Sequence, residues 1–143
     1  MIGAEGLRYL LAQAAGQLVA FPLEAVREII PPHVMTRLPG AGPWVLGLLN
    51  LRGTVLTVVD LTVRFGGEAG ESPSIVVLEV EGRTFGVQVA RVSAVSNARN
   101  GQEAPVDEAR SAEGLVRGLV EVAGGTALVI DVMALQHAAL AAV

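Results

Sequence analysis

The sequence predicts an all-β fold with an internally duplicated core, and three observations lead to this expectation. Hydrophobic residues make up 52% of the 143 residues and aromatic residues only 3%, so the core must be aliphatic. Valine is prominent, and β-branched side chains suit the half-buried surface of a sheet. The apolar residues fall into short runs between glycines and polar turns, and one such stretch occurs twice.

The duplication is visible as two gapless alignments in the same order along the chain. Residues 44–61 (WVLGLLNLRGTVLTVVDL) align with residues 115–132 (LVRGLVEVAGGTALVIDV), and residues 16–29 align with residues 82–95. In the first alignment the identical residues are Val45, Gly47, Leu48, Gly53, Val58 and Asp60, which fall on Val116, Gly118, Leu119, Gly124, Val129 and Asp131. Shared glycine and aspartate positions are harder to obtain by chance than shared valines. We therefore predict two similar halves that superpose in this register.

The sequence predicts five short strands in each half. They fall at residues 7–13, 18–21, 25–30, 48–51 and 55–59, and then at 75–80, 84–89, 92–96, 119–122 and 127–130. Strands this short cannot bury both faces alone, so we predict one domain made of two small packed barrels. The first barrel is expected at about residues 14–67 and the second at about 74–135, with a contribution from the strand at 7–13. The polar segments 66–74 and 98–114 have the composition of loops, and the second is long enough to be functional or mobile.

Two aspartates and four glycines are expected to have structural roles. Asp60 and Asp131 each follow a predicted strand and precede an apolar stretch, which is typical of a helix N-cap. The alanine- and leucine-rich residues 131–143 predict a short C-terminal helix. The structural glycines are Gly47 and Gly118 in the repeat, and Gly53 and Gly124 at the predicted hairpin turns.

The sequence carries no signature of catalysis. It has no phosphate-binding or dinucleotide-binding glycine loop, no nucleophile elbow and no zinc-protease motif. It has no cysteine, and its two histidines, His33 and His137, lie far apart without a second ligand at metal-binding spacing. The net charge of −4 argues against a nucleic-acid surface. We therefore expect no enzymatic activity, no cofactor, no metal and no nucleic-acid partner.

No segment predicts membrane insertion. No apolar run approaches the roughly 20 residues that span a bilayer. The stretch from Leu10 to Leu23 lacks a basic N-terminal region and is interrupted by Gln13, Gln17 and Pro22, unlike a signal peptide. A cytoplasmic protein is expected.

Arg52 is the residue for which the repeat indicates a local role. It precedes the turn glycine Gly53, whereas its counterpart in the second half is Ala123. Because the duplicated scaffold does not require a cation there, Arg52 is expected to form a salt bridge or to contact a partner. The plain alternative is a solvated turn arginine.

The stretch LLNLRGTVLTVVDL resembles the CheW family of bacterial chemotaxis coupling proteins, whose first half carries the pattern G-x-x-N-L-R-G-x-x-x-P-V-x-D-L. The matching residues are Gly47, Asn50, Leu51, Arg52, Gly53, Val58, Asp60 and Leu61. Residues 20–29 (AFPLEAVREI) resemble the family's opening segment, and residues 75–95 and 116–135 resemble its second half. The resemblance covers about residues 7–135.

This resemblance implies two intertwined five-stranded SH3-like barrels that act as a non-catalytic adaptor. Family members bind the regulatory domain of a CheA-type histidine kinase and the cytoplasmic tip of a methyl-accepting chemoreceptor, and they meet other CheW-like adaptors in cytoplasmic signalling arrays. By position, the resemblance implies partner-binding roles for Val26, Glu28, Arg52 and Ile75. Exposed aliphatic residues flanked by charges would form a small apolar patch with a polar rim, as in reversible interfaces.

The chain departs from the family pattern at three places, so alternatives stay open. One is the loop at residues 98–114, which is unusually poor in large apolar residues. Thr57 stands where the family usually has proline, and Ala90-Arg91 where an acidic residue is common. A specialised member that binds only one of the two partners is therefore one alternative. A small β-barrel enzyme or ligand-binding domain that uses the cleft between the halves is another. An SH3-like peptide or RNA binder is a third, which the acidic charge and scarce aromatic residues disfavour.

Overall fold

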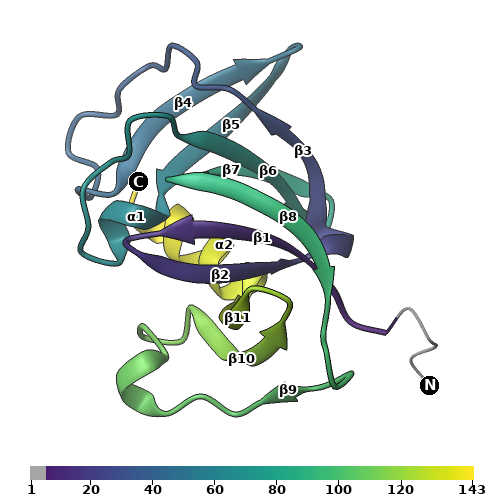
Figure 1. The fold of residues 1–143 in the computed structure, drawn as a ribbon. Coiled ribbons are helices and arrows are strands. Elements are labelled where there is room, and N and C mark those ends of the chain that lie inside the picture. Colours follow the sequence, from purple (N-terminus) through teal and green to yellow (C-terminus); the bar gives the residue numbers. More distant parts are fainter. Residues whose placement is uncertain (1–5) are drawn as a thin grey trace.

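A computed structural model describes residues 6–143 and consists of two β-sheets and a C-terminal helix (Figure 1). The strands are β1 (Arg8–Ala14), β2 (Gln17–Pro22), β3 (Val26–Ile30), β4 (Val45–Leu51), β5 (Thr54–Asp60), β6 (Ser74–Val80), β7 (Arg83–Val89), β8 (Arg91–Asn97), β9 (Glu103–Ala104), β10 (Val116–Val122) and β11 (Gly125–Ile130). The helices are α1 (Leu61–Arg64) and α2 (Val132–Ala141), with short 3-10 helices η1 (Leu23–Ala25) and η2 (Glu108–Arg110). The predicted all-β class with a short C-terminal helix is confirmed.

Each sheet takes strands from both halves of the chain. One sheet has the order β8-β1-β2-β11-β10-β9, and the other has the order β3-β6-β7-β5-β4. The β1–β2 hairpin of the first half therefore lies among strands of the second half. Reciprocally, the β6–β7 hairpin of the second half lies among strands of the first half. The barrels are intertwined in this sense. The chain bounds given above for the two barrels stay a prediction.

The strand registers of the two sheets are equivalent, as the duplication predicts. The parallel pair β5–β7 places Val58 opposite Gly86, and the parallel pair β11–β2 places Val129 opposite Ala20. In the sequence alignments Val58 falls on Val129 and Gly86 falls on Ala20. The antiparallel pairs β4–β5 and β10–β11 also share a register shift at the same aligned position.

Glycine is required at that shift because another segment passes close by. A β-carbon on Gly47 would lie 2.3 Å from the carbonyl oxygen of Thr36, and one on Gly118 would lie 2.8 Å from that of Ala104. Both distances are shorter than any contact a real β-carbon makes. The two glycines therefore let an equivalent segment approach β4 in one sheet and β10 in the other.

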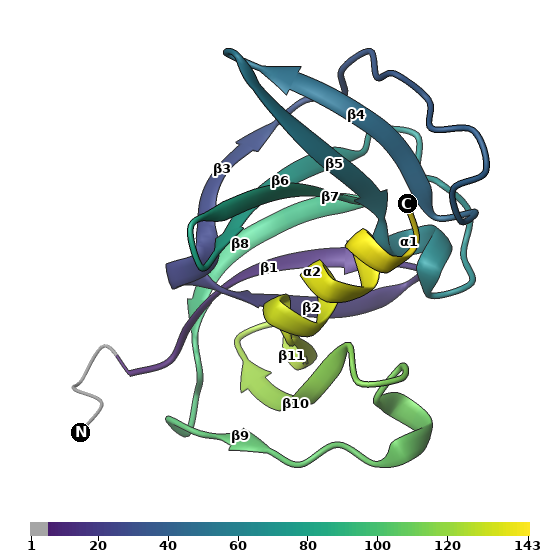
Figure 2. The ribbon, with the colours of Figure 1, turned by 180° about the vertical axis from the view of Figure 1, so that it is seen from behind.

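Both helices begin at an aspartate that accepts a backbone hydrogen bond. Asp60 Oδ1 accepts from the amide of Val63 at 3.2 Å, and Asp131 Oδ1 accepts from the amide of Ala134 at 3.0 Å. These are the N-caps expected at the two positions. The helices differ in length, since α1 has four residues and α2 has ten. Figure 2 shows α2 lying across the junction of the two sheets.

The segment 98–114 is more ordered than its composition indicates. It contains β9, which pairs with β10, and η2, whose cap Asp107 accepts a hydrogen bond from the Arg110 amide. Sequence reasoning missed both because two ladder pairs and a single helical turn leave no hydrophobic periodicity. Within residues 6–143 no helix is long and apolar enough to cross a membrane.

Candidate functional site

The β4–β5 turn presents Arg52 to solvent. Arg52 and Gly53 have φ values of 50° and 88°, the left-handed conformations that a two-residue hairpin turn requires. The Asn50 side chain accepts a hydrogen bond from the Gly53 amide at 3.0 Å and so fixes the turn. The Arg52 side chain remains 70% exposed. The turn therefore holds the Arg52 guanidinium group at a defined, solvent-accessible position.

Arg52 reaches across to β3 and pairs with Glu28. A second ion pair lies beside it, with Arg27 Nε 2.8 Å from Glu79 Oε1 of β6. The two pairs cross-connect β3 with the β4–β5 turn and with β6. Exposed ion pairs contribute about 0–1 kcal/mol because water screens them, so a partner's charges can replace either member at little loss.

Two exposed aliphatic residues lie on the same strand and hairpin as these charges. Ile29 follows Glu28 on β3 and is 44% exposed, and Val55 on β5 is 60% exposed. A shallow hollow of about 290 Å³ lies between Glu28, Arg52 and the neighbouring Leu51, Leu56 and Val77. We call Glu28, Ile29, Arg52 and Val55 the β3–turn surface. Exposed aliphatic residues within a polar rim are the usual anatomy of a reversible protein interface.

Val26 and Ile75, the other two residues expected to bind a partner, lie in different environments. Val26 is half-buried at the start of β3 and pairs with Leu78 beside a register shift. Ile75 is fully buried in the core, opposite Ile30 of β3. The expectation that Ile75 contributes to an exposed patch is therefore wrong, because its side chain packs inside the barrel beneath β3. Any effect of Ile75 on a partner must pass through the position of that strand.

The equivalent turn of the second half is built differently. Arg52 has a positive φ, whereas Ala123 does not, and the left-handed residue is instead Gly125 with a φ of 124°. Glu121 occupies the aligned position of Asn50 and bonds the Thr126 hydroxyl at 2.6 Å rather than a turn amide. The β3–turn surface is therefore particular to the first half in backbone as well as in side chain.

Sequence reasoning missed a polar network in the other sheet. The Tyr9 hydroxyl donates to Glu103, whose carboxylate also accepts from Arg117 Nε at 3.1 Å and Nη2 at 2.9 Å. The Arg117 hydrogen bonds hold the pKa of Glu103 below its usual range, and burial raises the pKa of Tyr9. The three residues lie on β1, β9 and β10, too far apart in sequence for a motif to reveal them. Their role is to fasten β9 to the sheet edge.

The two histidines lie on different elements of the described chain. His33 lies exposed in the β3–β4 loop, and His137 lies exposed on α2. Residues 6–143 hold no cluster of three or more histidine, aspartate and glutamate side chains suited to a metal ion. The buried Asp60 carboxylate is occupied by the Val63 amide and by Gln88 Nε2 at 3.1 Å.

Comparison with known proteins agrees with this architecture. The chain is 34% identical over 125 residues to the chemotaxis protein CheW of Rhizobium meliloti (strain 1021), which covers 83% of this chain and 81% of that protein. It is 33% identical over 93 residues to a probable chemotaxis protein CheW of Rhizobium etli, covering 62% of this chain and 60% of that one. The crystal structure of the scaffolding protein TtCheW from Thermoanaerobacter tengcongensis matches with a TM-score of 0.79 at 22% identity, over 88% of this chain and 89% of that chain. At that identity the likeness concerns the fold.

The family model described as "CheW-like domain" matches residues 8–139, which include both sheets, α1, most of α2 and the β3–turn surface. Because that match spans nearly the whole chain and a curated relative exceeds 30% identity over most of it, this chain belongs to the CheW-like domain family.

Proposed function

We propose that this chain is a non-catalytic chemosensory adaptor. It couples the cytoplasmic tip of a methyl-accepting chemoreceptor to the regulatory domain of a CheA-type histidine kinase. Membership of the CheW-like family supports the proposal, since the named relatives are chemotaxis proteins. In this role the chain acts in the cytoplasm, within receptor arrays, where other CheW-like adaptors are further partners.

The observation that carries the proposal is the Arg52–Glu28 pair at the edge of a hollow that Leu51, Leu56 and Val77 help to line. The second half of the duplication has no counterpart of this arrangement, since Ala123 replaces Arg52 and Ala94 aligns with Glu28. A charged pair that the duplicated scaffold does not need, at the edge of a partly apolar hollow, is suited to a partner. Val26 belongs to β3 itself, and the buried Ile75 of β6 lies opposite Ile30 of that strand.

The proposal is tested by titrating the full chain separately with a kinase regulatory domain and with a receptor-tip fragment. We expect Glu28→Arg and Arg52→Glu each to weaken binding at least about tenfold, because like charges then meet across the contact. Glu121→Arg, a charge reversal on the other sheet, should leave binding unchanged. The double variant Glu28→Arg/Arg52→Glu restores the internal ion pair with reversed polarity and should still bind poorly.

Two outcomes would change the proposal. If the double variant regained wild-type binding to every partner, the pair would be purely structural. If only one of the two partners bound the wild-type chain, the function would be that of a specialised adaptor, as the departures at Thr57 and Ala90-Arg91 leave open.

A further inference from the structure

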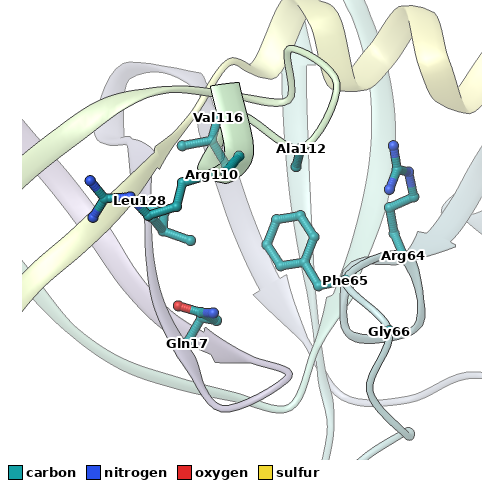
Figure 3. Close-up of a pocket in the computed structure, with 9 residues that line it drawn as sticks. Gln17, Arg64, Phe65, Gly66, Arg110, Ala112, Val116 and Leu128 are labelled. Atoms are coloured by element: carbon teal, nitrogen blue, oxygen red, sulfur yellow. The ribbon is translucent and has the colours of Figure 1, made fainter. Parts of the chain in front are cut away.

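The segment 98–114 between β8 and β10 is fastened at its centre and at its end. At the centre, β9 is held by the hydrogen bonds of Glu103. Figure 3 shows Arg110 and Ala112, from the end of the segment, beside a cavity of about 420 Å³. Residues 99–102, at the start of the segment, do not line that cavity and are exposed. Solvent therefore reaches this first turn directly.

Asn100 and Gly101 lie together in this turn. The Gly101 amide donates to the Ala98 carbonyl at 3.3 Å, a long hydrogen bond, and Gly101 has a φ of 72°. A β-carbon built on Gly101 would meet no atom within 4 Å outside the adjoining residues. In an asparagine followed by glycine, the side-chain carbonyl carbon and the next backbone nitrogen can close a five-membered ring, and glycine has no side chain that obstructs their approach. The surroundings of Gly101 leave that approach open.

A further hydrogen bond directs the Asn100 side chain along its own backbone. The Gln102 amide donates to Asn100 Oδ1 at 3.4 Å. Because Gln102 is only two residues further on, this bond folds the side chain back over the peptide unit that contains the Gly101 nitrogen. The same donor polarises the side-chain carbonyl and stabilises the negative charge that develops on its oxygen when a nucleophile adds.

The two other asparagines of the chain lie in strands. Asn97 ends β8, and the amide of the next residue, Ala98, donates to the Leu7 carbonyl at 3.0 Å. Asn50 lies in β4, and Leu51 after it is paired in the β4–β5 ladder. In both cases the backbone nitrogen next to the asparagine belongs to a sheet, so its attack on the side chain requires the strand to open.

We propose that Asn100 is a site of spontaneous deamidation in the folded protein, with the Gln102 amide assisting the reaction. The Gly101 nitrogen loses its proton to a base from the solvent and bonds to Asn100 Cγ, and the bond from Cγ to the side-chain nitrogen breaks. That nitrogen takes up a proton from water and leaves as ammonia, so a succinimide ring remains. Water then opens the ring at either of its carbonyl carbons, which gives aspartate or isoaspartate. No oxidant or reductant takes part.

The products change the connection between β8 and β9. Either product adds one negative charge to a chain whose net charge is −4. The isoaspartate form also lengthens the main chain by a methylene group. That group lies between Arg99, whose amide donates to the Glu121 carbonyl at 2.7 Å, and Glu103 of β9. This inference does not depend on the proposed function.

The test incubates the full-length folded protein at neutral to mildly alkaline pH and follows all three asparagines by peptide mapping with mass spectrometry. We expect Asn100 to convert at least about tenfold faster than Asn50 or Asn97, since a strand-opening cost of about 1.4 kcal/mol already accounts for that factor. In urea, Asn50 and Asn97 should accelerate because the sheets no longer protect them, whereas Asn100 should not. The rate at Asn100 should rise with pH, because the attacking nitrogen must lose its proton.

Variants separate the geometry of the turn from the chemistry of the asparagine–glycine pair alone. Gln102→Pro removes the assisting amide and keeps that pair, and it should slow conversion by about fivefold, the scale of a single hydrogen bond. Asn100→Gln is the control, because its longer side chain cannot close the five-membered ring and should yield no product at that position. Urea unfolding curves establish that both variants fold. An intact Asn100 after incubation, equal rates at the three asparagines, acceleration of Asn100 in urea, or an unchanged rate in Gln102→Pro would each overturn the inference.

Discussion

The Tyr9 hydroxyl donates a hydrogen bond to the carboxylate of Glu103, which lies 94 positions later in the chain. Tyr9 is only 1% exposed, so its hydroxyl depends on this partner, and Glu103 is held in turn by Arg117. The bond holds β9 at the edge of the six-stranded sheet. It thereby orders part of residues 98–114, a segment with the composition of a loop.

Replacing Tyr9 with phenylalanine should therefore destabilise the protein. A hydrogen bond to a charged acceptor contributes about 1.5 kcal/mol or more, so the free energy of unfolding of Tyr9→Phe should fall by about that amount. Thr126→Val removes another hydroxyl–carboxylate bond, that to Glu121, at an exposed site and should change stability by less than about 0.5 kcal/mol. Urea denaturation measures both. Equal effects of the two variants would show that burial of the bond is irrelevant.

The pH dependence of Tyr9 can be followed directly, because it is the only tyrosine in the chain. Burial raises its pKa above the ordinary value of about 10. A folded-state pKa above the unfolded one contributes stability that is complete below the unfolded pKa and is lost as the pH rises past it. Tyrosinate absorbance should therefore stay low through about pH 10 and appear only together with unfolding. Titration of the folded protein at the ordinary pKa would contradict the buried hydrogen bond.

Arg52→Ala should separate binding from stability. The arginine side chain is 70% exposed, so loss of its pair with Glu28 should lower the free energy of unfolding by about 1 kcal/mol at most. An interface arginine can contribute about 2 kcal/mol, which corresponds to roughly thirtyfold in binding to the kinase domain or receptor tip. Arg99→Ala, at an exposed position in the loop between β8 and β9, serves as the control. A fall in melting temperature large enough to explain the loss of binding would assign Arg52 a structural role.

The two helix caps should differ in strength although their geometry is the same. Asp60 is 1% exposed and its second oxygen accepts from Gln88 at 3.1 Å, whereas Asp131 is half-buried and caps α2. Loss of a cap lowers stability by about 1 kcal/mol, and a buried amide left without its acceptor adds about 1–3 kcal/mol. Asp60→Ala should therefore be the more destabilising of the two in thermal or urea unfolding. A larger effect of Asp131→Ala would show that the Gln88 contact contributes nothing.

Alanine at Gly47 or Gly118 should be poorly tolerated, since the new methyl would meet a carbonyl oxygen. Overpacking of this kind typically lowers stability by about 1–3 kcal/mol. Gly47→Ala should be the worse of the two because its φ of 144° also disfavours a side chain. Gly124→Ala provides the control, as its nearest neighbour, Leu18 Cδ2, is 3.8 Å away. Comparable unfolding curves for all three variants would remove the explanation given for the two repeat glycines.

Much of this fold was predictable because its signals are local. Strand positions follow from short apolar runs, the caps from an aspartate before each helix, and the duplication from aligned residues such as Gly47 and Gly118. The β4 and β10 strands begin three residues earlier than predicted, at Val45 and Val116. A glycine follows two positions after each start, and in the sequence it resembles the end of a strand. In the structure each strand continues through this glycine with a shift in register.

The candidate site was predictable only in part. Arg52 and Glu28 could be singled out, but the sequence could not show that they pair, because they lie 24 positions apart with the whole of β4 between them. Ile75 was misjudged for a related reason. The local sequence around an aliphatic residue in an apolar strand is the same whether its side chain faces the core or the solvent. In the structure, Ile30 and the barrel interior cover Ile75.

By itself, then, the sequence determined the strand content, the repeat, the caps and the family. Tertiary structure decided which hairpin joins which sheet, because β1–β2 and β6–β7 present equivalent edges and only packing selects the exchange. It also decided the difference between the halves, since α1 ends at Arg64 after four residues whereas α2 continues for ten residues to Ala141. Local propensity sets where an element forms, whereas burial against distant residues sets what it faces.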